Sequence, residues 1–378
     1  MAGINFTNYK NIVKINIGNN IKCSANFSNA FRDMTKLTSC TFPMEQVTDM
    51  SNAFYGCNKF IDNPRCTDSV VNMSGMYYNC VNLTGAPVCG NNVVDMSNAY
   101  AYCNKITNAP VCGPNVTNMS YAYAECKLMK GSVVCGPNVT DMSYAYKNCY
   151  NIKGSPVVGN NVVNMSNAFI NCNNISGTPV CGPNVTNMAD AYRNCKKLTG
   201  APVCGPNVTD MAFAYAYCSG ITGSPVCGDK VLNFTDAYSN CSSLTGKPVC
   251  SNSVTTMRMA YMDCTSLWGP PVCGENVTSL YHTYFDCRGL SGNAYFYSNI
   301  VNTAANCFYN RRNTLALNIH VHKNSLTLNT LLANKKAYSL FGANVSWTNN
   351  GTHYWNKTYN VRIYPVDNVA ATKLAHGL

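Results

Sequence analysis

Cysteine is the residue type in this sequence that offers the most chemistry. The chain of 378 residues holds 23 cysteines, against 16 acidic residues and 5 histidines. So many thiols can form disulfides, bind a soft metal ion or act as nucleophiles. Each role needs a partner at a set spacing: a second thiol at disulfide distance, a Cys-x-x-Cys pair or a histidine base. The spacing of the cysteines therefore decides among these roles.

Most of the cysteines fall into two columns that recur at one period. The first column is Cys57, Cys80, Cys103, Cys126, Cys149, Cys172, Cys195, Cys218, Cys241, Cys264 and Cys287; the second is Cys66, Cys89, Cys112, Cys135, Cys181, Cys204, Cys227, Cys250 and Cys273. The sequence contains no Cys-x-x-Cys pair, and the two columns lie apart from the histidines. We therefore predict neither a zinc site nor a cysteine nucleophile.

Free thiols and a disulfide framework are the two interpretations of these columns. If successive repeats stack as coils, column neighbours lie about 5 Å apart, which the Cα limits of a disulfide allow but its Cβ spacing of about 3.5–4.5 Å does not. Val158 also stands at a position of the second column, as a small apolar residue that packs like a thiol. We predict buried free thiols made in a reducing compartment, with disulfides as the alternative.

Other catalytic groups are scarce. Glu45, Glu125 and Glu275 are the only glutamates, and the sequence shows no Ser/His/Asp grouping and no phosphate-binding loop. We expect His320 and His322 on the outer face of an alternating strand, where two histidines without a carboxylate are more typical of a surface than of a metal site. We therefore predict a protein that is not an enzyme and that uses no cofactor or metal ion.

The cysteines are positioned by a repeat. Counted from one apolar residue per copy, every step is 23 residues, in the order Phe27, Met50, Met73, Met96, Met119, Met142, Met165, Met188, Met211, Phe234, Met257 and Leu280. We call these residues the Met column. A fixed period of this length is typical of a solenoid, in which each copy forms one coil stacked on the next.

Each copy combines two predicted elements. From the Met column, a small residue follows at three, an aromatic at four and the first-column Cys at seven, which predicts a two-turn amphipathic helix. The residue before the Met column is Asn, Asp, Thr or Ser, as an N-cap requires. The other half, as in 199–207, predicts a short parallel strand ending at Val203, shortened by a recurring proline such as Pro202, and then a turn.

These elements predict the fold class and the domains. We expect an α/β repeat solenoid, a leucine-rich-repeat-like right-handed coil of about twelve strand-turn-helix units, over residues 27–302. Residues 1–26 are predicted to form an N-terminal cap. Residues 303–378 are predicted to form a small α+β module, with a strand at 315–322, a helix at 324–334 and a hairpin of strands at 345–348 and 359–364.

The net charge and the lack of targeting motifs limit the kinds of partner and the cellular location that we expect. The net charge is +11, but the basic residues are scattered, so we expect no specific nucleic-acid partner. We expect no membrane span, and no secretory signal because the start lacks a basic segment followed by an apolar run. The Asn-x-Thr and Asn-x-Ser triplets, such as those at Asn115 and Asn138, are expected to serve the repeat rather than glycosylation.

The repeat unit resembles a known family. Its pattern Val-Thr-Asp-Met-Ser-x-Ala-Tyr-x-x-Cys-x-x-Leu, over about residues 20–302, is similar to the BspA-type leucine-rich-like repeats of bacterial, mycoplasmal and protist surface proteins and of phage-encoded proteins. The resemblance implies a parallel sheet on one face and adhesion to host or partner surfaces. The Gly-x-Pro-Val-Cys segment and the shortened loop depart from the family pattern.

The resemblance and the predicted absence of a signal together favour one function. We expect a phage virion or tail-associated appendage whose solenoid binds a host-cell surface glycan or protein, or other virion proteins. A second copy of the chain, in a homo-oligomer, is among the partners considered. A bacterial or protist cell-surface adhesin and a cytosolic protein–protein scaffold are the alternatives.

Two variable tracks are predicted to bind the ligand, because the fixed columns are used in the core. One track follows the apolar residue that stands ten positions after the Met column, and it ends in an aromatic residue; the other lies on the outer face of the predicted helix. The first holds Lys130, Lys153, Thr199, Thr222, Thr245 and Trp268, and the second holds Tyr78, Tyr102, Tyr150, Tyr217 and Phe285. Hydroxyls beside exposed aromatic rings suit sugars, whereas Thr can also be present because it favours strands.

Overall fold

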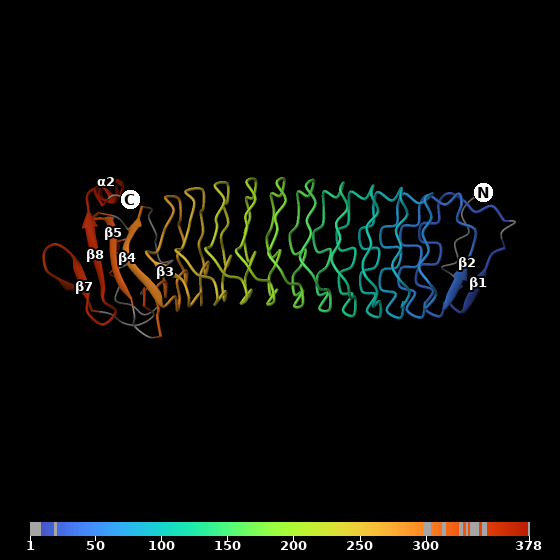
Figure 1. The fold of residues 1–378 in the computed structure, drawn as a ribbon, viewed down its shortest axis with the longest axis horizontal. Coiled ribbons are helices and arrows are strands. Elements are labelled where there is room, and N and C mark those ends of the chain that lie inside the picture. The colour runs from blue at the N-terminus through green and yellow to red at the C-terminus, as the bar shows by residue number, and fades with distance from the viewer. Residues whose placement is uncertain are drawn as a thin grey trace. The chain divides into compact units, whose positions relative to one another are not determined.

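The structure is a computed structural model, and it describes residues 9–18, 21–297, 304–311, 315–324, 328–329, 332, 340–341 and 346–376. The chain divides into two compact units, Met1–Val185 and Thr186–Leu378, which we call the N-terminal and C-terminal units. Within each unit the chain winds into stacked coils (Figure 1). In the C-terminal unit the coils lead into a small sheet capped by a helix.

The predicted helix in each coil is wrong. The eight residues from the Met column to the first cysteine column form a run of tight turns, which we call the turn run. In the turn run 50–57, Asn52 has φ 54° and Gly56 has φ 73°, whereas every residue of an α-helix has negative φ. Bonds of the i→i+3 type close the turns, from Ala53 N to Met50 O at 3.0 Å and from Cys57 N to Phe54 O at 3.1 Å.

Hydrogen bonds between coils explain why turns replace the helix. In the turn run 50–57, alternate amides donate to the next coil, from Met50 N to Asn72 O and from Asn52 N to Ser74 O, both at 2.8 Å. The same holds for Phe54 N and Gly56 N, which donate to Met76 O and Tyr78 O, both at 2.8 Å. In a helix beginning at Met50 these two amides would bond within their own coil, and the carbonyls of the next coil would lose their donors. The C-terminal unit repeats the pattern, with Phe213 N donating to Thr235 O at 2.9 Å.

The residue before the Met column has a different role from the predicted N-cap. The Asp49 carboxylate accepts a hydrogen bond from Ser51 N at 2.8 Å, two residues on, which is an Asx turn. The Asp49 backbone forms a parallel bridge with Asn72 of the next coil. A short polar side chain is therefore needed here, as the sequence indicated, but it begins a turn run and not a helix.

The predicted parallel strand is present only near the ends of the stack. Strand β1 (Lys14–Asn16) pairs with β2 (Ser39–Thr41), and β3 (Trp268–Gly269) pairs with β4 (Gly289–Phe296), both in parallel. No residue from 42 to 267 lies in a strand, and this half of the coils carries only isolated bridges such as Ser132 with Lys153.

Buried tyrosine hydroxyls replace the missing strand ladder. Pro87 has no amide to donate, and the following residue, Val88, donates its N–H to the Tyr100 hydroxyl at 2.9 Å. The same hydroxyl donates to Val88 O at 2.8 Å. Tyr123 holds Val111 in the same way, at 3.0 and 2.6 Å. One side chain thus satisfies both backbone groups of the residue after the proline position.

The aromatic column forms the centre of the core. In the N-terminal unit the Tyr100 and Tyr123 rings stack with centroids 5.6 Å apart and an interplanar angle of 2°. In the C-terminal unit Tyr215 and Tyr238 stack at 5.4 Å and 3°. These four side chains are fully buried. Stacking of identical rings holds each coil in register with its neighbour.

The C-terminal sheet has six strands in the order β3-β4-β5-β8-β7-β6. Strands β5 (Ala316–His322) and β8 (Val361–Val366) lie parallel to β4. Strand β7 (Tyr354–Asn356) pairs antiparallel with β8, and β6 (Thr348–Asn349) pairs antiparallel with β7. Figure 1 shows β4, β5 and β8 side by side, with helix α2 (Val369–Ala375) at one end of the sheet.

Two predictions for this sheet need correction. The strand β6 pairs with β7 and not with the segment 359–364, which forms the separate parallel strand β8. His320 is buried, not exposed, because β5 is an interior strand and its imidazole lies between the Tyr295 and Tyr364 rings, 5.0 Å from each. Burial lowers the pKa of His320 to about 4. His322 is exposed, and the helix predicted at 324–334 lies mostly outside the described residues.

Residues Ala304–Tyr309 repeat the backbone pattern of a turn run beyond β4. Asn306 has φ 55°, and the Phe308 ring stacks on Tyr284 at 5.7 Å, continuing the aromatic column. Tyr284 N donates to Cys307 O at 2.9 Å. The boundaries of the cap at 1–26, the solenoid at 27–302 and the module at 303–378 remain predictions.

Candidate binding surfaces on the coils

The cysteine columns are part of the core. All 23 cysteines are free thiols. In the first column the Cys103 thiol donates to Tyr77 O of the preceding coil at 3.1 Å. In the second column the Cys66 sulfur accepts a hydrogen bond from Gly90 N at 3.2 Å, and burial raises the pKa of Cys66 to about 11. Protonated, partnered thiols are poor nucleophiles and poor metal ligands.

The first predicted track is exposed in both units. Lys130 and Lys153 are exposed in the N-terminal unit. In the C-terminal unit Trp268 is 52% exposed. Thr199, Thr222 and Thr245 of the same track are also exposed. Their backbone amides are used between coils, since Thr245 N donates to Gly223 O at 2.9 Å and Trp268 N to Gly246 O at 3.1 Å. The side chains therefore form a row with one residue per coil.

The end of this track is an aromatic ring under a cation. The Lys247 ammonium lies 5.7 Å from the centroid of the Trp268 ring. The hydroxyl of Thr245 makes only a long contact of 3.4 Å to Gly223 O. A partly exposed ring and an exposed hydroxyl thus lie on neighbouring coils, and their role in binding stays a prediction.

The second predicted track is richer in aromatic residues than expected. The outward side chains of the turn runs in the N-terminal unit include five tyrosines, which we call the tyrosine face: Tyr55, Tyr78, Tyr102, Tyr121 and Tyr144. Tyr102 is 39% exposed and the other four are half-buried. Only Tyr78 and Tyr102 had been singled out in the sequence, because a helical face and a turn run expose different positions.

The rings of the tyrosine face stack on one another. The centroids of Tyr55 and Tyr78 are 4.5 Å apart at an angle of 6°, and Tyr78 and Tyr102 are 5.3 Å apart at 60°. Tyr121 and Tyr144 stack at 4.3 Å and 7°. Burial and the neighbouring Tyr102 and Tyr55 hydroxyls raise the pKa of Tyr78, so its phenol is neutral. Ring edges and hydroxyls, more than ring faces, are available to a partner.

A basic side chain packs on the first and on the last ring of the tyrosine face. The Arg32 guanidinium lies 4.3 Å from the Tyr55 centroid, and the Lys147 ammonium lies 5.5 Å from that of Tyr144. Such cation–π contacts contribute about 0.5–1 kcal/mol at exposed sites. A hollow of about 370 Å³ opens beside the Tyr55–Tyr78 pair, lined also by Asn52, Ser74, Gly75, Ser97 and Asn98.

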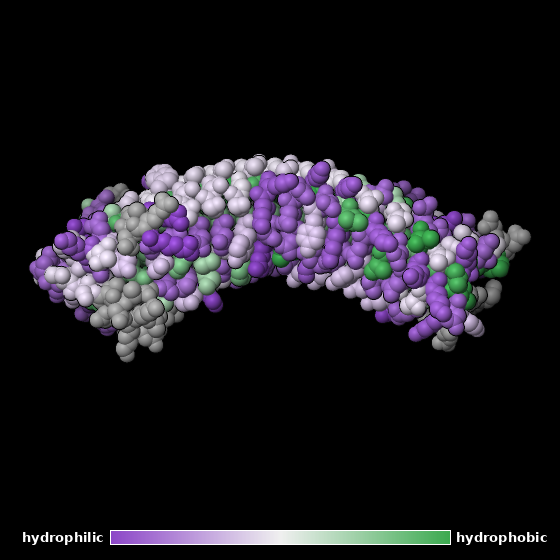
Figure 2. Space-filling view, turned by 90° about the horizontal axis from the view of Figure 1, so that it is seen from below, coloured by the Kyte–Doolittle hydropathy of each residue, from purple (hydrophilic) through white to green (hydrophobic). Residues whose placement is uncertain are grey.

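The C-terminal unit has its own aromatic residues on the turn runs. Tyr217 is 42% exposed and occupies the place in its coil that Tyr102 occupies in an N-terminal coil. Further along, Phe285 lies 5.1 Å from the His282 ring and 4.8 Å from the Tyr309 ring. On the face seen in Figure 2, most surface residues are hydrophilic and the hydrophobic ones are scattered.

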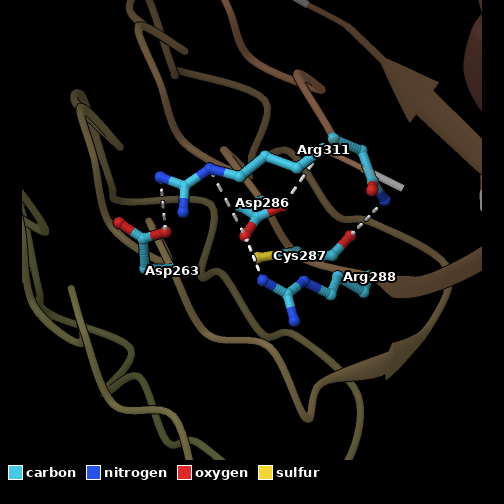
Figure 3. Close-up of polar contacts among 6 residues, drawn as sticks. Asp263, Asp286, Cys287, Arg288 and Arg311 are labelled. Atoms are coloured by element: carbon cyan, nitrogen blue, oxygen red, sulfur yellow. Dashed lines mark hydrogen bonds and ion pairs between the residues drawn. The ribbon is translucent and has the colours of Figure 1, made fainter. Parts of the chain in front are cut away.

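In the C-terminal unit an ion cluster surrounds the buried Asp286, with partners that are partly exposed (Figure 3). The Asp286 carboxylate accepts from the Arg288 guanidinium at 2.7 Å and from Arg311 N at 3.1 Å, and the Arg311 side chain also reaches Asp263 at 3.9 Å. Burial raises the pKa of Asp286, but the bonds from Arg288 and Arg311 outweigh it and hold the pKa below its usual range. The adjoining Cys287 thiol donates to Tyr261 O at 3.0 Å, and burial raises its pKa. The paired charges of the cluster join residues 304–311 to the preceding coil.

Comparisons with known proteins agree with the repeat pattern. A family described as "BspA type Leucine rich repeat region (6 copies)" matches residues 97–199, and "Mycoplasma protein of unknown function, DUF285" matches residues 22–133. A solved leucine-rich repeat protein from Bacteroides ovatus aligns with 83% of this chain and 80% of its own, at 14% identity and a TM-score of 0.44. No curated protein matches this sequence.

Residues 97–199 are therefore similar to BspA-type leucine-rich repeats, and the described coils form a repeat solenoid. Within the described residues, no helix has the length and apolar character that crossing a membrane requires. Those residues also contain no group of three or more His, Cys, Asp or Glu side chains placed to hold a metal ion.

Proposed function

We propose that this protein is a non-enzymatic repeat protein that attaches to a surface or a partner molecule through side chains exposed on its coils. BspA-type repeats are associated with protein or surface interaction, which supports this assignment in general terms. The observation that carries the proposal for this chain is the tyrosine face.

Folding does not require tyrosine at these positions. The turn-run places of Tyr55 and Tyr78 are taken by Ala101 and Ala124 in later coils, and that of Tyr102 by Asn148. Tyrosine presents a large, rigid and amphipathic surface at a low cost in conformational entropy, which is why it is frequent at binding sites. A run of outward tyrosines in coils that do not need them therefore supports binding.

The partner and the carrier complete the proposal. We propose that the protein is carried on a phage virion, as an appendage or tail-associated protein, and that its partner is a host-cell surface glycan or protein. Free thiols support assembly in a reducing compartment, such as the host cytoplasm in which virions are built. The first alternative is an adhesin on a cell surface. The second is a cytosolic protein–protein scaffold, which applies if the protein is found neither on phage particles nor on cell surfaces.

Attachment of purified protein to candidate host cells tests the binding surface. We expect the double variant Tyr78→Ser/Tyr102→Ser to lose at least tenfold in attachment while its melting temperature changes little. The matched control is Val71→Ser/Val94→Ser, which removes two exposed apolar side chains, 43% and 40% exposed, from another column of the same unit. Equal loss in both double variants would indicate nonspecific adsorption and contradict the proposal.

The first track provides the competing surface. If Trp268→Ala combined with Thr245→Ala abolishes attachment and the tyrosine variants do not, the ligand binds along the Trp268 row instead. Immunogold labelling and mass spectrometry of purified phage particles and of cell-surface fractions test the carrier. Detection in cell-surface fractions without particles would contradict the virion assignment and leave the attachment proposal intact.

A further inference from the structure

Gly75 interrupts a column of the tyrosine face. It is the third residue of its turn run, where the neighbouring coils carry Asn52 and Asn98. Its φ of 60° is close to the 54° of Asn52 and the 58° of Asn98. Since asparagine adopts this backbone conformation in both neighbouring coils, the turn does not require glycine here. What distinguishes Gly75 is the missing side chain.

The hollow beside Tyr55 and Tyr78 depends on this glycine, because a Cβ on Gly75 would meet Asn52 Oδ1; without it the Asn52 amide has room at the edge of the hollow. Gly75 lies between the flanking Asn52 and Asn98, and the hydroxyl-bearing Ser74 and Ser97 complete the lining. Its volume of about 370 Å³ is near the lower end of the range of small-molecule sites, about 300–1,000 Å³. The hollow therefore has room for one ring of a ligand and not for a folded segment.

The polar groups of the hollow are available to a ligand. In the described part of the chain, the side-chain amides of Asn52 and Asn98 and the hydroxyls of Ser74 and Ser97 make no hydrogen bond to protein. Each amide supplies two donors and an acceptor, and each hydroxyl supplies a donor and two acceptor lone pairs. A ligand with several adjacent hydroxyls matches this set.

Charge and backbone pairing exclude other ligand classes. No charged side chain lines the hollow, and the nearby Arg32 is engaged with the Tyr55 ring and, at 3.6 Å, with Asp33. An extended peptide would need unpaired backbone groups, but Asn52 N and Gly75 N already donate to Ser74 O and Ser97 O at 2.8 and 2.7 Å. An uncharged, hydroxyl-rich ring is the ligand that remains.

We propose that the Gly75 hollow binds a single neutral hexopyranose residue of a surface glycan. This inference rests on the proposed attachment function and names the ligand class for one point of the tyrosine face. The phenol edges of Tyr55 and Tyr78 contact the ring, and the asparagine and serine side chains hydrogen-bond its hydroxyls.

Saturation-transfer NMR with small sugars tests the proposal on the full chain. The probes are methyl glucoside, methyl galactoside, methyl mannoside and N-acetylglucosamine, with glucuronic acid and sialic acid as charged comparisons. We expect a signal from at least one neutral sugar. The variant Gly75→Asn restores the residue of the neighbouring coils, and its Cβ meets Asn52 Oδ1 and displaces the Asn52 amide. It should reduce that signal at least tenfold, and the melting temperature should change little because the displaced atom is the end of a flexible side chain.

The matched control is Gly56→Asn, which makes the same change at a positive-φ glycine (φ 73°) that does not line the hollow. It should retain sugar binding. Should Gly75→Asn not fold, Asn98→Gly keeps the backbone conformation, removes one amide and should weaken binding about tenfold. Binding unchanged in Gly75→Asn, binding of charged sugars only, or no binding by the wild-type chain would overturn the proposal.

The outcomes also separate this inference from the function on which it rests. If Gly75→Asn loses sugar binding and cell attachment together, both stand. If Gly75→Asn keeps both sugar binding and cell attachment while Tyr78→Ser/Tyr102→Ser loses attachment, the hollow is not the sugar site. The attachment function then remains. If the wild-type chain attaches to no surface, the attachment function is wrong whatever the sugars show.

Discussion

In the coils whose aromatic column holds tyrosine, the buried hydroxyl fixes the backbone of the opposite half of the coil. Tyr123 is fully buried, and its hydroxyl bonds both the N–H and the C=O of Val111. A buried backbone group that loses its partner costs about 1–3 kcal/mol. Tyrosine and phenylalanine are therefore not equivalent in this column, although both fill the same space in the core.

The first prediction follows from this bond pair. We expect Tyr123→Phe to lower the free energy of unfolding by about 1–3 kcal/mol, because Val111 loses both partners. Urea unfolding followed by circular dichroism measures it. The control Tyr144→Phe makes the same change on the tyrosine face and should stay within about 0.5 kcal/mol. Equal effects of the two changes would refute the role of the buried hydroxyl.

Thiol chemistry gives the second prediction at the residue scale. Burial raises the pKa of Cys66 to about 11 and that of Cys112 to about 12, from an ordinary value of 9.0. A thiol whose pKa is raised by folding contributes stability below its unfolded pKa, and this contribution is lost as pH rises. We expect the urea midpoint to be flat from pH 6 to 8 and to fall between pH 9 and 12.

Two measurements check this thiol prediction. The double variant Cys66→Ala/Cys112→Val should lose less stability than the wild type between pH 9 and 11, and valine already stands in this column at Val158. Native protein at pH 7 should label weakly with a thiol reagent and fully after denaturation without reductant. An intact mass lower by about two protons per cysteine pair would show disulfides instead.

At the scale of the element, the turn run replaces the helix that the spacing predicted. Apolar residues at 0, 3, 4 and 7 face one side in a helix, and they also face one side in two successive tight turns. The positive φ at Asn52 and Gly56 sends alternate amides to the next coil. An isolated turn run has no stable form of its own, so each coil depends on its neighbours.

The ion cluster of the last coils gives the prediction at this scale. Asp286→Asn removes the charge that holds Arg288 and Arg311, and we expect a loss of about 1–3 kcal/mol, reduced because both arginines are partly exposed. The pKa of Asp286 is lowered by folding, so its contribution is present above the unfolded pKa and is lost as pH falls. The variant should show a flatter decline in stability below pH 4.

Thermal melts from pH 2 to 7 provide the measurement. The control Asp229→Asn changes an exposed carboxylate in another coil and should leave both the melting temperature and its pH dependence unchanged. If the melting temperature of Asp286→Asn falls with pH just as that of the wild type does, the cluster contributes no stability.

At the scale of the whole molecule, the repeat makes the chain nearly one-dimensional. Coils contact their neighbours, and the bonds at one step are the same at the next; Met119 N donates to Asp141 O at 2.9 Å and Met142 N to Asn164 O at 3.0 Å. Stability should therefore be close to a sum over coils and the interfaces between them.

A deletion in register tests this additivity. Removing residues 142–164, one complete period, joins Asp141 to Met165 and keeps every column in phase. We expect the circular dichroism spectrum to keep its shape and unfolding to remain cooperative, with a lower midpoint. Removing residues 142–153 alone shifts the columns by half a coil and should abolish soluble folded protein. Similar behaviour of the two deletions would contradict the stacked-coil fold.

The sequence by itself determined the period, the inward columns and the placement of most cysteines in the core. These follow from residue types that recur at one spacing, and a repeat states them many times. The tracks that hold Trp268 and Tyr102 were also visible, because they are the positions that the repeat leaves variable.

Only the tertiary structure decided between helix and turn run, and with it which side chains are exposed on the surface proposed to bind. The spacing of the apolar residues is the same in both, and what differs is whether an amide bonds within its coil or to the next. That choice turns Tyr55, Tyr121 and Tyr144 outward and places Gly75 between Asn52 and Asn98. A hydrogen bond between residues 22 apart leaves no mark in the local pattern, because it depends on a neighbour that the pattern does not describe.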